Sequence, residues 1–381
     1  MSFGRLKKVI IRKPPRGHYS CIPQLVVGHD DFKLYIEGDE LYVDMLAAIA
    51  AAQKSVDMES YIFAADEVGW RFAEALAAKG AEGVVVRLHI DAAGSLHWGS
   101  RQLERFLRLH NVQVHRFHRW SWRKPWRYNR RNHRKLLVVD KREAYLGGFN
   151  IHRESSREFA GEARWRDTHV RMRGHLARQA SFLFDRFWAG DRRWVLRVVN
   201  ASSVLVPNHN SHCRRSFYCL YTHVFESAQQ TLYLTTPYFV PDNRTQRALK
   251  RAAERGVDVR LLVPAKSDVP ITQWAAQAAY ASLLASGVQI FEYLPRMLHA
   301  KTVVIDGSWG SLGTANLDYR SFFLNYELNL VSRDRELCEE LQQQFLTDLA
   351  EAKQIVATRW AQRRWYRRVL ELVGWMARRW L

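Results

Sequence analysis

The stretch that decides the fold is eighteen residues long and occurs twice. The first copy runs from His133 to Asn150, begins HRKLLVVD and ends GGFN; the second runs from His299 to Asn316, begins HAKTVVID and ends GTAN. In both copies Lys follows His by two positions, Asp by seven and Asn by seventeen. Two unrelated strands rarely agree at four positions with the same spacing, so we interpret the stretch as an internal repeat.

Each copy predicts a β-hairpin. An aliphatic, partly β-branched run leads to a polar turn that opens at Asp140 or Asp306, and a second short strand follows. Residues two apart on a strand share a face, so the His and the Lys of one copy point the same way. We interpret the two aspartates as turn residues that fix the hairpin and its Lys by local backbone bonding. A direct role as catalytic acids is the alternative.

Two sets of His, Lys and Asn suit the chemistry of a phosphate ester. Positive charge and hydrogen-bond donors that could cradle a phosphate come from Lys135, Lys301, Asn150 and Asn316. The histidines, His133 and His299, provide one nucleophile and one acid–base. In-line displacement at phosphorus needs a group on each side of the bond, which a site with twofold symmetry provides.

A histidine nucleophile needs one ring nitrogen free and the other held by an acceptor. Asp167 begins an apolar stretch 34 residues after His133, and Glu327 lies in a comparable stretch 28 residues after His299. Because a buried carboxylate requires a partner, we expect these two acids to orient the histidines. The alternative for Asp167 is a salt bridge to the neighbouring Arg166.

The repeat resembles the HxKxxxxD motif and the following GGxN of the phospholipase D superfamily, and the resemblance covers most of the chain. Residues 312–321 (LGTANLDYRS) and 325–327 (NYE) look like a bacterial cardiolipin synthase, particularly the shorter type without amino-terminal membrane spans. One departure is Thr314, where the first copy has Gly148.

The resemblance implies two similar α/β/α domains with one active site between them. It also implies a reaction: a phosphatidyl group passes from one phosphatidylglycerol to another through a phosphohistidine, giving cardiolipin and glycerol. In that reaction His133 is the nucleophile and His299 the acid–base.

Outside the motif the two halves repeat one order of elements. Strands and helices alternate over 32–117 and again over 204–293, with a break near 195–203. This predicts an α/β fold with two mixed, mostly parallel sheets, helices on both faces and a pseudo-twofold relation between the halves. We expect the segments to be a basic lead-in, two domains and a basic amphipathic helix, over 1–28, 29–199, 200–357 and 358–381.

The net charge and the tryptophan content limit the classes of binding partner that fit this chain. A formal net charge of +20, from 58 Lys+Arg against 38 Asp+Glu, indicates nucleic acid or an anionic membrane surface. The 14 tryptophans favour the membrane, since Trp concentrates at bilayer interfaces. Basic and aromatic residues alternate over 116–134, and the tail from residue 358 combines Trp and Arg in a helical pattern. We interpret both as contacts with anionic phospholipid. The alternative for 116–134 is a nucleic-acid patch, and the alternative for the tail is a helix packed on the body.

Several expectations concern what the sequence lacks. No apolar run approaches eighteen residues and there is no signal-peptide pattern, so we expect a peripheral protein on the cytoplasmic side of the cell membrane. No metal-ligand or disulfide spacing is present, so we expect no cofactor or metal and reduced thiols at Cys21, Cys213, Cys219 and Cys338. The alternative functions are phospholipid hydrolysis, a nuclease on the same scaffold and a non-enzymatic membrane protein. The sequence does not fix the oligomeric state.

Overall fold

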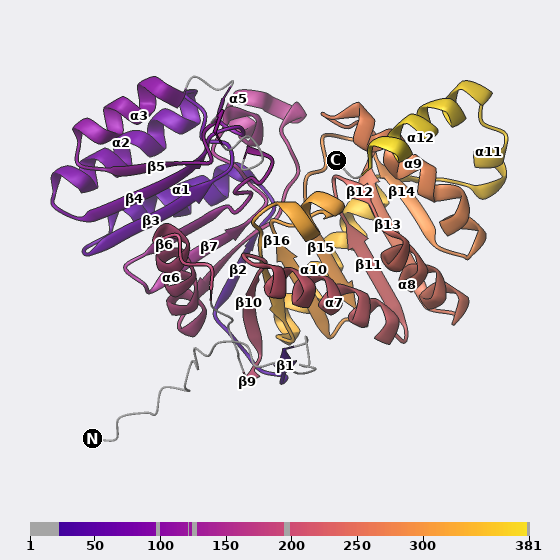
Figure 1. The fold of residues 1–381 in the computed structure, drawn as a ribbon. Helices are drawn as coiled ribbons and strands as arrows, with labels where there is room; N and C mark the ends of the chain where they lie inside the picture. Colours follow the sequence, from indigo (N-terminus) through magenta and orange to yellow (C-terminus); the bar gives the residue numbers. More distant parts are fainter. Residues whose placement is uncertain (1–22, 97–99, 121, 124–127, 194–198, 379–381) are drawn as a thin grey trace.

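The computed structural model describes residues 23–96, 100–120, 122–123, 128–193 and 199–378. Within them the chain forms two α/β domains that lie side by side, each built on a mixed sheet (Figure 1). The predicted pair of similar α/β units is confirmed. Of the expected lead-in over 1–28, residues 1–22 lie outside the described residues, and the rest includes the short strand Gln24–Leu25.

The first domain has a seven-stranded sheet. Its order is β2 (Phe32–Tyr35), β8 (His169–Arg173), β7 (Glu143–Gly147), β6 (Leu136–Val139), β3 (Ser55–Ser60), β4 (Val85–Asp91) and β5 (Gln113–Phe117). The helices α1 (Gly38–Ala50), α2 (Glu67–Ala81) and α3 (Ser100–Leu109) share one core with the sheet. The helix α6 (His175–Trp188) covers the other face.

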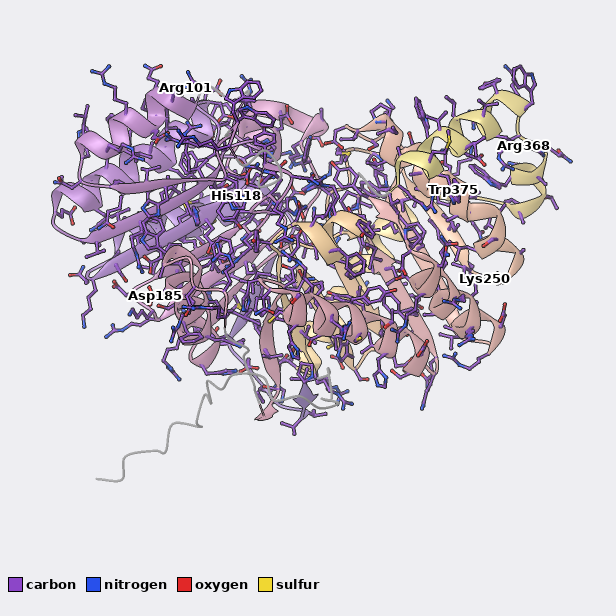
Figure 2. All side chains as sticks on the ribbon, in the orientation of Figure 1. Arg101, His118, Asp185, Lys250, Arg368 and Trp375 are labelled. Atoms are coloured by element: carbon purple, nitrogen blue, oxygen red, sulfur yellow. The ribbon has the colours of Figure 1, made fainter. Side chains whose placement is uncertain are left out.

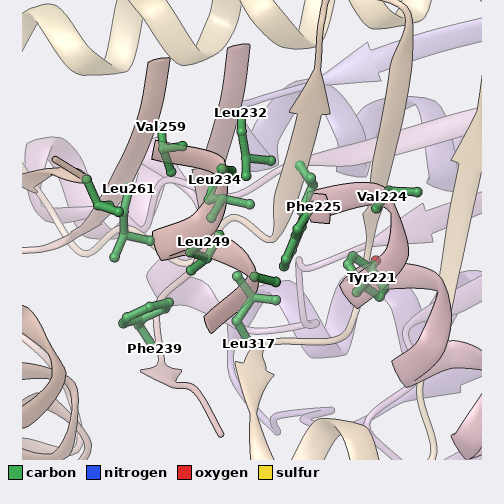
Figure 3. Packing of buried hydrophobic residues seen from close by; sticks show 14 of the residues in the cluster. Tyr221, Val224, Phe225, Leu232, Leu234, Phe239, Leu249, Val259, Leu261 and Leu317 are labelled. Carbon is green, nitrogen blue, oxygen red and sulfur yellow. The ribbon is translucent and has the colours of Figure 1, made fainter. Parts of the chain in front are cut away.

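The second domain repeats this plan with an eight-stranded sheet. Its order is β10 (Ser203–Pro207), β18 (Leu328–Ser332), β16 (Trp309–Gly313), β15 (Thr302–Ile305), β11 (Thr231–Thr235), β13 (Asp258–Pro264), β14 (Gln289–Tyr293) and β19 (Ala352–Gln354). On one face lie α7 (Ser211–Ser227), α8 (Asn243–Glu254) and α9 (Pro270–Ala285); α10 (Arg335–Ala350) lies on the other. Figure 3 shows apolar side chains of α7 and α8 meeting those of β11 and β13.

The remaining described elements are short. Two small ladders join β1 (Gln24–Leu25) to β9 (Val199–Ala201) and β12 (Phe239–Val240) to β17 (Leu317–Asp318). Single turns of helix occur at η1 (Arg153–Ser155), α5 (Arg157–Ala160), η2 (Gly161–Ala163) and η3 (Arg320–Leu324). Cys213 and Cys338 are buried, and Cys219 is partly buried.

The prediction of mixed sheets is confirmed, but the prediction that they are mostly parallel is wrong. Within the two large sheets only β3–β4–β5 and β11–β13–β14 run parallel. Every other neighbouring pair in the two large sheets is antiparallel. The reason is the repeated motif: its hairpin and the strand that returns beside it pair antiparallel, and they supply three of the seven strands in the first sheet and three of the eight in the second.

A shared core joins the domains. Apolar residues of α6 and β6 to β8 pack in one cluster with those of α10, β10, β15, β16 and β18. Buried ion pairs reinforce the junction, because Arg166 lies 2.8 Å from Asp348 in α10 and Glu37 bonds both Arg164 and Arg296 at 2.6 Å. The hairpins of the two motifs are therefore held against each other at the domain junction.

The tail forms α11 (Ala357–Ala361) and α12 (Trp365–Ala377), and α12 lies along α9 (Figure 1). Contact is close at Gly374, where an added Cβ would lie 2.3 Å from the backbone nitrogen of Ala275. The outer face is uncovered, with Trp365 77% exposed and Met376 59% exposed. The tail thus packs on the body by one edge and leaves apolar side chains free. None of the described helices is long and apolar enough to cross a membrane.

Candidate active site

The two hairpins are anchored by their aspartates. Asp140 and Asp306 adopt left-handed backbone angles, with φ of 51° and 50°, at the turns between β6 and β7 and between β15 and β16. The Asp140 carboxylate accepts hydrogen bonds from the backbone N–H groups of residues 53, 54 and 55 at 2.7–2.9 Å. Asp306 accepts from those of residues 229, 230 and 231. Each carboxylate therefore fixes the start of the neighbouring strand, β3 or β11. Each aspartate lies at the end of its hairpin strand that is distant from the histidine, which supports the turn interpretation over a catalytic one.

Backbone segments from the two domains pair at the centre of the molecule. The N–H of His133 donates to the carbonyl of Tyr326 at 3.0 Å, and the N–H of Tyr326 donates to the carbonyl of Arg131 at 2.8 Å. The N–H of His299 donates to the carbonyl of Arg166 at 2.7 Å, which is the same arrangement related by the pseudo-twofold axis. Each histidine is therefore fixed next to the segment that carries the acid of the other domain.

Each histidine accordingly pairs with the carboxylate of the other domain. His133 Nδ1 lies 3.0 Å and 3.1 Å from the two oxygens of Glu327, and His299 Nδ1 lies 2.5 Å from Asp167 Oδ2. Along the chain each acid follows the histidine of its own half, but the structure pairs it with the histidine of the other half. The alternative salt bridge is wrong, because the Arg166 guanidinium binds the Asp348 carboxylate and the backbone carbonyl of Asp167.

Burial keeps both imidazoles neutral. Each histidine is less than a tenth exposed. Burial lowers the pKa of His133 in spite of Glu327, and burial together with Lys301 lowers the pKa of His299 to about 3. A neutral ring that donates its Nδ1–H to a carboxylate keeps a lone pair on Nε2. The geometry thus provides two activated Nε2 atoms, one from each domain.

The two lysines lie beside these histidines. Lys135 Nζ donates to the carbonyl of His133 at 2.9 Å, and Lys301 Nζ lies 2.9 Å from His299 Nδ1 and 3.9 Å from Asp167 Oδ2. Burial, followed by the charge of Lys301, lowers the pKa of Lys135 to about 7, and burial lowers that of Lys301 to about 8. A phosphate anion placed between them would raise both pKa values, because an opposite charge favours the charged form.

The asparagines of the motifs are buried near the same centre. The Asn150 side-chain oxygen accepts from the N–H of Ile62 at 3.1 Å, next to Tyr61, whose ring centroid is 4.9 Å from that of His133. Asn316 lines a small cavity together with Lys301, and its buried side-chain oxygen has no hydrogen-bond partner among the described residues. The structure therefore brings the His, Lys and Asn of both motifs to one place.

Four further side chains belong to the site; the sequence pointed to one of them only as a departure from the repeat and did not single out the other three. The Tyr61 ring lies 5.3 Å from Lys135 Nζ, and the rings of Trp165 and Tyr238 lie 5.1 Å and 6.4 Å from that of His299. Tyr61 and Tyr238 occupy equivalent places after β3 and β11, so the repeat itself was the available signal.

The fourth is Thr314, the departure from the repeat. Its hydroxyl donates to Glu327 at 2.6 Å and so holds the acid that holds His133. At the equivalent Gly148 there is no room for a side chain, because an added Cβ would lie 2.0 Å from Asp167 Oδ1. A side-chain hydroxyl thus supports Glu327, and none supports Asp167 from the equivalent position. In the sequence this difference is visible only as Thr in one copy of the repeat and Gly in the other.

No group of three or more His, Cys, Asp or Glu in the described part of the chain could hold a metal ion. Independence from metals stays a prediction, since it depends on chemistry rather than on this observation. The lysines and asparagines offer the charge and donors that a divalent cation would otherwise supply.

Comparisons with known proteins agree with this geometry. Residues 45–188 and 221–349 match the family described as cardiolipin synthase, PLD-like domain. The cardiolipin synthase of Clostridium perfringens (strain SM101 / Type A) is 35% identical over 337 residues, covering 84% of this chain and 70% of that protein. Cardiolipin synthase 2 of Bacillus anthracis is 34% identical over 353 residues, covering 88% and 67%.

Two solved structures share the fold. The phosphatidylserine synthase of Haemophilus influenzae Rd KW20 superposes with a TM-score of 0.66 at 16% identity, covering 93% of this chain and 94% of that one. The polyphosphate kinase of Porphyromonas gingivalis superposes with a TM-score of 0.61 at 13% identity, covering 86% and 49%. At these identities the likeness concerns the fold alone.

Proposed function

The chain belongs to the family of phospholipase D-like cardiolipin synthase domains, and we propose that it is a cardiolipin synthase. The reaction is transfer of a phosphatidyl group from one phosphatidylglycerol to a hydroxyl of a second, with release of glycerol. The observation that carries the proposal is the buried pair of His–Lys–Asn sets, in which each histidine is held by a carboxylate of the opposite domain.

The first step forms a phosphohistidine. Nε2 of His133 attacks the phosphorus of the donor lipid, the P–O bond to glycerol breaks, and His299 gives its proton to the leaving oxygen. Glu327 supports His133 as the imidazole becomes positive, because it accepts the Nδ1–H. His299 must hold a proton at this moment. The anionic phosphate supplies the reason, since a negative charge beside His299 raises its pKa from the low value of the free site.

The second step transfers the phosphatidyl group. The hydroxyl of the second phosphatidylglycerol attacks phosphorus, His299 takes the hydroxyl proton, and the P–N bond to His133 breaks. Throughout, Lys135 and Lys301 balance the charge on the non-bridging oxygens, with donors from Asn150 and Asn316. Because these residues supply the charge, we expect activity to survive EDTA.

The lipids reside in a bilayer, and exposed aromatic residues support docking at its surface. Trp120 and Trp122 are 50% and 85% exposed in the first domain, and α12 exposes Trp365 in the second. In Figure 2, Arg101 of α3 and Trp375 of α12 both lie in the upper half of the molecule. Exposed Trp and Arg together favour an anionic membrane interface, and we propose its cytoplasmic face.

The basic residues before His133 do not all serve this surface. Arg131 and Arg134 turn inward, where they pair with Asp91 at 2.8 Å and with Glu59 at 3.2 Å. Arg116 is likewise paired with Glu104. Residues 121 and 124–127 of the same stretch lie outside the described residues. The proposed membrane contact of residues 116–134 therefore rests on Trp120, Trp122 and the remaining described arginines, not on the full stretch.

Two alternatives share the chemistry: hydrolysis of phospholipid, and cleavage of nucleic acid. A nuclease has no use for the uncovered apolar face of α12, which disfavours it. The decisive experiment is incubation of purified protein with phosphatidylglycerol vesicles and identification of the products by mass spectrometry. Cardiolipin and glycerol in equal amounts support the proposal. Phosphatidic acid alone indicates hydrolysis, and absence of any product contradicts both.

A further inference from the structure

A groove outside the catalytic centre lies between the tail and the edge of the second sheet. Its volume is about 570 Å³, within the range of about 300–1,000 Å³ typical of small-molecule sites. It is bordered by β14, β19, α11 and the start of α12. The basic residues that line it are Lys353, Arg359, Arg363, Arg364 and Arg367. None of its lining residues belongs to the His–Lys–Asn sets.

The groove carries positive charge that the protein does not balance. Arg363 is bonded to Glu371, and Lys353 is the cross-strand partner of Glu292. Among the described residues, the other three arginines, at 359, 364 and 367, form no ion pair as short as 4 Å, although the charge of Arg367 reaches Glu292. Three guanidinium groups around one concave site suit a phosphate, because Arg binds phosphate oxygens through paired N–H donors.

The wall of the groove offers a reporter of what binds there. Trp360 lines the groove and is 9% exposed, and the Arg363 guanidinium carbon lies 4.9 Å from its ring centroid. Its indole nitrogen is closed to solvent, so a ligand changes the indole resonance through the ring and its neighbours and not through a direct hydrogen bond. The thirteen-residue helix α12 also begins beside the groove without a side-chain cap, which leaves N–H groups of its first turn available to an anion.

We propose that this groove binds the headgroup phosphate of one anionic phospholipid, as a second lipid site that takes no part in the chemistry. The ligand is a bilayer lipid rather than free phosphate because the groove runs onto the apolar face of α12. Tyr366 lines the groove and is 41% exposed, and the face continues through Val369 (49%), Leu372 (55%) and Met376 (59%). The phosphate sits among the arginines and the acyl chains lie along α12.

The identification of the ligand as a bilayer lipid rests on the proposed function. Binding itself can be tested in a protein that does not turn over. The test uses the full chain with ¹⁵N-labelled Trp and His133→Ala, which stops turnover. Short-chain phosphatidylglycerol is added below its micelle concentration while the indole N–H resonances are followed; Trp360→Phe assigns the relevant one. We expect a saturable shift of the Trp360 resonance, and little shift with short-chain phosphatidylcholine, whose net charge is zero.

Charge variants provide the second arm. Replacing Arg359, Arg364 and Arg367 with Gln should weaken binding at least about tenfold, since each arginine contributes to attraction of an anionic lipid. The matched control removes the same three charges from α8 by changing Arg247, Lys250 and Arg251 to Gln, and should keep the wild-type affinity. If the triple variant loses its dispersed indole spectrum, Arg364→Gln alone is titrated against the same expectation.

Three results would overturn the proposal. The first is no shift of the Trp360 resonance, and the second is equal affinity for phosphatidylglycerol in the arginine variant and the α8 control. The third is an affinity for inorganic phosphate equal to that for phosphatidylglycerol, which would show that the groove does not recognise a lipid. Because the titration reads one indole in an inactive chain, it succeeds or fails independently of the products found with phosphatidylglycerol vesicles.

Discussion

Glu327→Gln should abolish the reactivity of His133 although Glu327 lies in the other domain. The carboxylate contacts His133 Nδ1 through both oxygens at 3.0 Å and 3.1 Å, and it is buried. A hydrogen bond to a charged group contributes about 1.5–3 kcal/mol, which corresponds to about 10- to 150-fold in rate. Loss of the correct ring tautomer increases this reduction in rate further, because a Gln amide can turn its NH₂ toward Nδ1 and so favour the tautomer with the proton on Nε2.

The assay separates the two histidines by the leaving group. A phosphatidyl ester of p-nitrophenol needs no acid to expel its alcohol, so its burst reports only the nucleophile. Glu327→Gln should lose the burst, whereas Asp167→Asn should keep it and fail with phosphatidylglycerol. The matched pair makes the exchange testable: if Asp167→Asn loses the burst and Glu327→Gln keeps it, then either the acids act within their own domains or His299 is the nucleophile, and the reasoning is refuted.

Three further predictions follow from single features. Thr314→Val should slow turnover about fivefold, which corresponds to the loss of one buried hydrogen bond, and Thr314→Ser should have the wild-type rate. Equal rates in the two variants would show that the hydroxyl does not contribute. Changing Trp365, Leu372 and Met376 to Ser should reduce sedimentation with anionic vesicles and spare cleavage of a soluble phosphodiester, because these side chains are exposed and α12 keeps its contact with α9. The pH profile of kcat/KM on a soluble substrate should fall as pH rises through about 7, because the free site loses the charge of Lys135 there, while kcat should fall only at higher pH; a flat kcat/KM between pH 6 and 9 would oppose this.

The sequence predicted the parts of the site that are local. His133, Lys135 and Asn150 lie on one hairpin, and both the hairpin and its turn are determined by nearby residues. The exchange of Glu327 and Asp167 could not be predicted, because it depends on pairing of the Asn132 and Tyr326 backbones across 194 residues of sequence. A motif shows which residues act but not which copy of the repeat supplies each one.

Two other outcomes have physical reasons as well. Alternating strands and helices gave an excess of parallel pairs in the prediction, because the alternation reports only the βαβ part of each sheet. The hairpin of each motif and the strand that pairs with it add antiparallel strands. The contact of Gly374 with Ala275 decided how α12 lies on α9, and a helical pattern of Trp and Arg carries no information about such a close approach.

The most direct test of the central claim is to find the residue that carries the phosphatidyl group. The protein is mixed with the p-nitrophenol ester, quenched within the burst at alkaline pH, where phosphohistidine is stable, and digested for mass spectrometry. We expect a phosphatidyl group on the peptide that contains His133, and none on that peptide in Glu327→Gln. A label on the peptide that contains His299, or a burst with no covalent label, would contradict it.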